Sequence, residues 1–61
     1  MDALTEARKF RKCGDEATEK GNYMEAAGDY RTAAALFRIA KDEVSAMICD
    51  DLADCCDDDE Y

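Results

Sequence analysis

The sequence contains no histidine, no tryptophan and no proline, and only three glycines. Histidine is the side chain that most often serves as a general base near neutral pH, so a nucleophilic cysteine or serine would lack its usual activating partner. A Gly-rich phosphate-binding loop is absent as well. The many carboxylates lie in strongly polar stretches, where nothing would desolvate them and tune a pKa for acid–base chemistry. We therefore expect a protein that is not an enzyme, has no catalytic residues and binds no cofactor.

Long apolar runs are missing too. No stretch approaches the ~18 residues of a membrane-spanning helix, and the segment MDALTEARKF lacks the hydrophobic core of a signal peptide. The sequence thus predicts a cytoplasmic protein without a membrane partner. In a reducing compartment its cysteines stay thiols, and Cys13 and Cys49 can serve as small buried hydrophobic residues. Together with Cys55 and Cys56 they lack the C-x2-C spacing of a zinc site, so no metal site is expected.

Basic residues are absent after Lys41. Residues 1–41 contain all eight Lys and Arg against seven Asp and Glu, whereas residues 42–61 contain nine acids and no base. The negative field of this last third repels nucleic acid and anionic lipid, and it attracts basic partners. We accordingly expect no direct contact with nucleic acid. We also expect a single domain over residues 1–56, followed by an acidic, flexible tail at 57–61.

Apolar residues recur at intervals of three or four along almost the whole chain, which predicts amphipathic helices. One stripe lies within residues 4–17 and a second within residues 23–37. The third stripe consists of Val44, Met47, Ile48, Leu52 and Cys55. No stretch alternates between apolar and polar residues, and β-branched residues are few, so strands are not expected. The sequence predicts an all-α fold with helices at roughly 2–20, 22–40 and 42–56.

The two breaks between these helices carry different signals. The KGN segment at 20–22 combines a glycine that can adopt a positive φ with an asparagine that can cap a helix. The second break has no glycine or proline, but Arg38 and Lys41 favour a helix end and Asp42 favours a helix start. With this break, the chain forms a small antiparallel three-helix bundle, which buries the third stripe without a partner. Without it, the alternative is a helical hairpin with one long second helix over 22–56, whose exposed apolar half requires a homodimer.

The residues around the first break form a pattern of aromatic and small side chains. These residues are Phe10, Cys13, Gly14, Gly21, Tyr23, Ala26, Tyr30 and Ala33. Residues 7–40 thereby resemble the tetratricopeptide repeat, a pair of antiparallel helices with an aromatic residue, two glycines, and then Tyr, Ala, aromatic and Ala on the second helix. Residues 41–56 would then act as a capping helix, and the three-helix arrangement is similar to that of MIT domains.

This resemblance implies a protein-interaction module. As a small adaptor or regulator, the chain would bind another protein through its helical faces. Its aromatic and alanine stripes are expected to be core, so the contact residues should lie on the exposed faces. Helical phase places four such candidates: Arg11, Asp15, Glu19 and Arg31.

A second hypothesis rests on the acidic last third. The carboxylates there could imitate a nucleic-acid backbone, and the chain would then be an inhibitor that occupies the basic cleft of a DNA- or RNA-binding protein. The acidic surface would consist of Asp50, Asp51, Asp54 and Asp57. This hypothesis predicts steep salt dependence and competition with nucleic acid, whereas an adaptor binding through apolar grooves should keep its partner in high salt.

Overall fold

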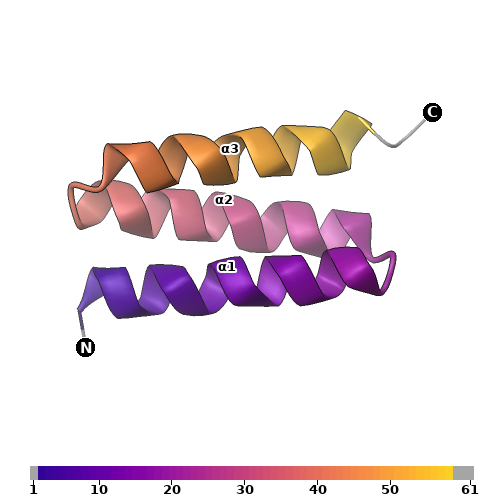
Figure 1. The fold of residues 1–61 in the computed structure, drawn as a ribbon, viewed down its shortest axis with the longest axis horizontal. Helices are drawn as coiled ribbons and strands as arrows, with labels where there is room; N and C mark the ends of the chain where they lie inside the picture. The colour runs from indigo at the N-terminus through magenta and orange to yellow at the C-terminus, as the bar shows by residue number, and fades with distance from the viewer. Residues whose placement is uncertain (1, 59–61) are drawn as a thin grey trace.

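The chain folds into three helices joined by two short turns (Figure 1). The computed structural model describes residues 2–58, with side chains described as far as Cys56. Helix α1 spans Ala3–Glu19, α2 spans Tyr23–Ile39 and α3 spans Glu43–Asp58. Successive helices run antiparallel, and α2 lies between the other two and packs against both. The predicted all-α, antiparallel three-helix bundle is thereby confirmed.

Helix α1 is closed at both ends by local hydrogen bonds. The side chain of Asp2 accepts a hydrogen bond from the backbone N–H of Thr5 at 2.8 Å, which makes Asp2 the N-cap. At the other end Gly21 adopts a positive φ of 81°. The backbone N–H of Asn22 then donates to the carbonyl of Ala17 at 2.8 Å. This is a Schellman motif, in which a left-handed residue after the helix lets the chain satisfy the last carbonyls and turn away.

The second turn repeats the first with a different residue at the left-handed position. Lys41 has a φ of 66°, and the backbone N–H of Asp42 donates to the carbonyl of Phe37 at 2.8 Å. Asp42 also caps α3, because its carboxylate accepts the backbone N–H of Ser45 at 3.3 Å and the Ser45 hydroxyl at 2.9 Å. The alternative of one long helix over 22–56 is wrong, because the chain reverses direction at Lys41.

Helix α3 continues beyond its predicted end. It ends at Asp58 instead of residue 56, so Asp57 and Asp58 belong to the helix and not to the predicted flexible tail. The physical reason is that no glycine or proline occurs in this part of the sequence to stop the helix. The remainder of the expected tail, 59–61, lies outside the described residues.

The core consists mainly of small side chains packed around two aromatic rings. Tyr30 and Phe37 of α2 are buried. Around them lie the buried alanines Ala7, Ala17, Ala26, Ala27, Ala33, Ala34, Ala46 and Ala53. Helices that face one another through alanines can approach closely, so a short chain reaches dense packing without large apolar side chains. The buried glycine of α1, Gly14, has the same effect beside the Tyr30 ring.

The side of α3 that packs against the bundle differs from the predicted one. Of the predicted stripe, only Leu52 is partly buried, while the exposed members are Val44, Met47, Ile48 and Cys55. The buried residues of α3 are Ala46, Cys49, Ala53 and Cys56. They also recur at helical spacing, on the opposite side of the helix. Burial of the larger stripe is therefore a wrong prediction, because the stripe of small side chains lets α3 approach the alanines of α2 more closely.

Candidate interaction surfaces

Three of the residues predicted to contact a partner form one row along α1, here called the α1 row. Arg11, Asp15 and Glu19 are exposed and lie four residues apart, so they share one side of the helix. This side is turned towards α3, since the charges of both Arg11 and Asp15 act on the thiol of Cys49. The predicted exposure of these three residues is confirmed, and their contact with a partner stays a prediction.

Asp15 also connects α1 to α2. Its carboxylate accepts a hydrogen bond from the hydroxyl of Tyr30. Burial raises the pKa of Tyr30 above its ordinary value of 10.0, and the hydrogen bond to Asp15 raises this pKa further. Tyr30 thus keeps its proton at neutral pH and remains a hydrogen-bond donor. Asp15 is consequently held in place, in contrast to a freely rotating surface carboxylate.

The fourth predicted contact residue, Arg31, lies on a different surface. It is exposed on α2 and directly follows Tyr30. Successive residues of an α-helix point about 100° apart, so Arg31 faces away from the side that Tyr30 buries. The structure therefore groups Arg11, Asp15 and Glu19, and it leaves Arg31 outside this group.

Three acidic residues of the second hypothesis, Asp50, Asp51 and Asp54, lie on one side of α3. Asp51 and Asp54 are exposed, while Asp50 is half-buried and forms an ion pair with Arg38 of α2. This pair is largely solvated, so its contribution to stability is small. Asp57 belongs to the same helix, but its side chain lies outside the described side chains. Exposed Met47 lies among these acids, so the surface is part carboxylate and part apolar.

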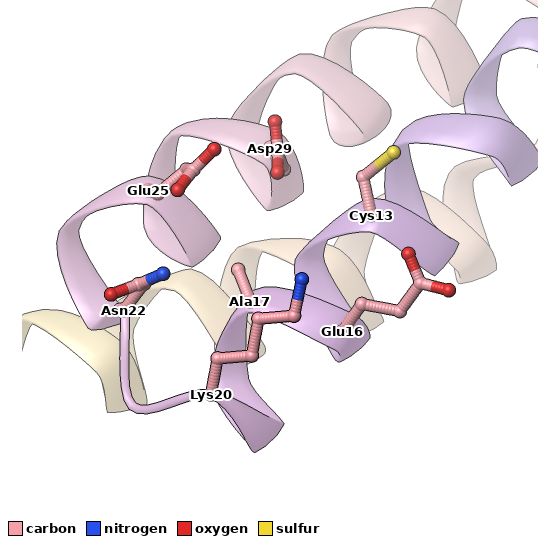
Figure 2. Close-up of a pocket in the computed structure, with 7 residues that line it drawn as sticks. All are labelled: Cys13, Glu16, Ala17, Lys20, Asn22, Glu25 and Asp29. Carbon is pink, nitrogen blue, oxygen red and sulfur yellow. The ribbon is translucent and has the colours of Figure 1, made fainter.

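A polar pocket of about 250 Å³ lies between α1 and α2 near their connecting turn (Figure 2). Its lining residues are Cys13, Glu16, Ala17 and Lys20 of α1, and Asn22, Glu25 and Asp29 at the start of α2. Figure 2 shows Glu25 and Asp29 on successive turns of α2, across from Cys13 and Lys20. Three carboxylates against one ammonium give the pocket a negative charge, which favours cationic groups over anionic ones.

A more apolar cavity of about 160 Å³ receives residues from all three helices. This three-helix cavity is lined by Thr18 of α1, Tyr23 and Tyr30 of α2, and Leu52, Cys55 and Cys56 of α3. Two of its three hydroxyl groups already have partners: Tyr30 donates to Asp15, and Thr18 donates to the carbonyl of Gly14 at 2.9 Å. Because these groups need no further partner, the cavity is suited to an apolar group rather than a polar one.

The four thiols divide into two exposed and two buried groups. Cys49 and Cys56 are buried, whereas Cys13 and Cys55 are exposed, so the expectation of a buried Cys13 is wrong. Cys13 lines the polar pocket between α1 and α2 and does not enter the core. Burial raises the pKa of the Cys49 thiol, and the nearby charge of Arg11 opposes this effect. All four thiols are free, and the described side chains contain no cluster of three or more potential metal ligands.

Comparison with protein-family models, with curated proteins and with solved structures found no match to this chain. The likeness to the tetratricopeptide repeat therefore stays a prediction carried by the spacing of its glycines, tyrosines and alanines. Within the described part of the chain, each helix is too short or too polar to cross a lipid bilayer.

The three-helix cavity was not predicted from the sequence. Tyr23 was expected in the core and Leu52 and Cys55 in a buried stripe, yet all three border an open cavity. One signal was available: Ala46, Cys49, Ala53 and Cys56 form a second helical stripe in α3 whose small residues match the alanines of α2. Packing α3 through that stripe leaves Cys55 exposed and Leu52 only partly buried, and both then border the cavity.

Proposed function

We propose that this protein is a non-catalytic interaction module, which binds a segment of another protein by taking one apolar side chain into the three-helix cavity. The observation that supports this proposal most strongly is the composition of the cavity. All three helices contribute to it, its lining is mainly apolar, and two of its three hydroxyl groups have partners within the chain. Such a site gains free energy from an apolar group and has few unsatisfied polar atoms to offer a polar one.

The size of the cavity supports a single anchoring side chain. An apolar cavity of about 150 Å³ can hold a benzene molecule. The three-helix cavity, at about 160 Å³, is therefore large enough for a leucine or phenylalanine side chain. Burying such a side chain contributes roughly 1.5–3 kcal/mol, which corresponds to a tenfold to hundredfold effect on affinity.

The α1 row supplies the charged border of the proposed site. Asp15 contacts Tyr30, which lines the cavity, and Arg11 and Glu19 lie one helical turn to either side of Asp15. Arg11 is positive, whereas Asp15 and Glu19 are negative. A fixed arrangement of opposite charges selects bound segments by the positions of their charges and not by net charge alone. We therefore assign affinity to the cavity and selectivity to the α1 row.

The test uses the full chain and peptides selected from a random displayed library. The two exposed cysteines provide a matched pair of variants, because Cys55 lines the cavity and Cys13 lines the polar pocket on the other side of α1. Cys55→Phe fills the cavity and should weaken binding of the selected peptides at least about tenfold. Cys13→Phe should leave binding unchanged, and both variants should keep the helical circular dichroism of the parent.

The selected sequences also separate this proposal from the nucleic-acid-mimic hypothesis. An interaction module of the proposed kind selects peptides with one large apolar residue at a fixed position. An acidic decoy selects Lys- and Arg-rich peptides without such a residue, which moderate salt or added DNA displaces and which Asp51→Asn and Asp54→Asn weaken. Equal binding by the parent and by Cys55→Phe would overturn the proposal.

A further inference from the structure

The most exposed large apolar side chains of the described residues all lie on α2 and α3. Met24 and Ile39 of α2 are 84% and 69% exposed, and Val44 and Met47 of α3 are 70% and 63% exposed. Exposed Ala35 lies on the same side of α2 as Met24 and Ile39. We call these five residues the α2–α3 face. Solvent-exposed apolar residues that gather on neighbouring helices typically mark a contact with another protein.

We propose that the α2–α3 face is the interface of a two-fold symmetric homodimer, in which α3 of each copy packs over α2 of the other. This inference goes beyond the proposed function. None of the residues that line the three-helix cavity belongs to the α2–α3 face, so each copy in the dimer keeps its own cavity. The dimer would then present two cavities to a partner.

The hairpin geometry of α2 and α3 sets which residues would meet. Both helices leave the turn at Lys41 and rise by about 1.5 Å per residue, so residues equally far from Lys41 stand at the same height. Ala35 and Met47 are each six positions from Lys41, and Arg31 and Asp51 are each ten positions from it. A two-fold axis parallel to the helices preserves these heights. It therefore brings Met47 over Ala35 of the second copy, a large side chain over a small one.

The charges on the two helices favour a contact between α3 and α2 of the second copy over a contact between the two α3 helices. The exposed basic residues of α2 are Arg31 and Arg38, whereas α3 exposes Asp51 and Asp54. With α3 over α2 of the second copy, Asp51 comes to the height of Arg31 and opposite charges meet. A contact between the two α3 helices would instead oppose carboxylates, in chains that each carry a net charge of −8.

The apolar residues also argue against α1 as the surface that covers α3. The exposed residues of α1 include Arg8, Lys9 and Lys12, which would complement the acids of α3. However, α1 has none of the large apolar side chains that are exposed among the described residues. Only α2 offers both exposed apolar residues and basic residues. It therefore complements both the exposed apolar residues and the acidic residues of α3.

Sedimentation equilibrium of the full chain over a range of concentrations tests the dimer. The parent should approach the mass of two chains as its concentration rises. Ala35→Glu and Met47→Glu place a charge in the apolar contact, and each should raise the dimer dissociation constant at least about tenfold. Lys9→Glu lies on α1 and is the matched control, which should dimerise as the parent does. All of these positions are solvent-exposed, and circular dichroism checks that each variant remains helical.

A charge exchange tests the register. Arg31→Asp and Asp51→Arg should each weaken the dimer, and the chain that carries both changes should regain most of the lost affinity. A parent that remains monomeric at every concentration would overturn the proposal, as would an Ala35→Glu variant that dimerises normally. Either failure leaves the proposed function intact, because peptide binding to the cavity can be measured separately in the Ala35→Glu variant.

Discussion

The ring of Tyr30 lies directly against the backbone of Gly14. A Cβ added to Gly14 would stand 2.8 Å from Cε1 of that ring, closer than such atoms approach one another. The ring belongs to a buried residue whose hydroxyl is bound to Asp15, so it has little room to move. The contact between α1 and α2 therefore depends on the absence of a side chain at this one position.

Gly14→Ala should consequently destabilise the protein, although alanine is the better helix former. We expect a loss of about 1–3 kcal/mol in the free energy of unfolding, measured by urea denaturation. Gly28→Ala is the control on α2, since a Cβ there meets nothing within 4 Å and replaces a glycine inside a helix. It should stabilise by roughly 0.5–1 kcal/mol. Equal effects of the two changes would show that Gly14 is not in tight contact.

The burial of Tyr30 and its hydrogen bond to Asp15 should make the folded protein less stable at alkaline pH. The pKa of Tyr30 is raised above its ordinary value of 10.0 in the folded protein, chiefly by burial. A raised pKa contributes stability that is complete below the unfolded-state value and is lost as the pH rises through the folded-state value. The free energy of unfolding should therefore fall more steeply above pH ~10 in the parent than in Tyr30→Phe. Parallel curves for the two proteins would contradict this role of Tyr30.

Lys41 occupies a backbone conformation that suits glycine. Its φ of 66° lies in the left-handed region, where a side chain costs about 1 kcal/mol. Lys41→Gly should thus stabilise the protein by up to about 1 kcal/mol, with the gain reduced by the greater freedom of glycine in the unfolded chain. Gly21→Lys at the equivalent position of the first turn should have the opposite sign. Thermal unfolding of the two variants measures both effects, and a loss of stability in Lys41→Gly would refute the account of this turn.

Thiol labelling tests which side of α3 is buried. Cys13 and Cys55 are exposed, whereas Cys49 and Cys56 are buried and burial raises the pKa of Cys49. A thiol-reactive probe at neutral pH should therefore modify two cysteines rapidly, and the other two only as the protein unfolds. Peptide mapping by mass spectrometry identifies the modified residues. Rapid labelling of Cys49 together with slow labelling of Cys55 would mean that α3 packs through its larger stripe.

The positions of the helices could be predicted from the sequence because their signals are local. The KGN segment at 20–22 carries its own turn chemistry, and Asp42 carries its own capping chemistry. The orientation of α3 could not be predicted from its hydrophobicity, because both of its sides carry an apolar stripe. The stripe with Val44 and Ile48 is the more hydrophobic, but the stripe with Ala46 and Cys49 fits the alanine surface of α2.

The candidate site likewise has one part that local sequence signals predict and one part that they do not. Helical phase alone was enough to place Arg11, Asp15 and Glu19 on an exposed side of α1. The three-helix cavity depends on how far α1 and α3 stand apart at one end of α2, which no local pattern encodes. Thr18 and Cys56, whose side-chain oxygen and sulfur atoms are 4.0 Å apart across the two helices, mark the place where this distance is set.

The most direct test of the proposed function is amide chemical-shift mapping of the labelled full chain with a selected peptide. The proposal predicts that the largest changes fall on Thr18, Tyr23, Leu52 and Cys55, with smaller ones along the α1 row. Changes confined to Asp51 and Asp54, or to Met24 and Met47, would contradict the cavity as the binding site.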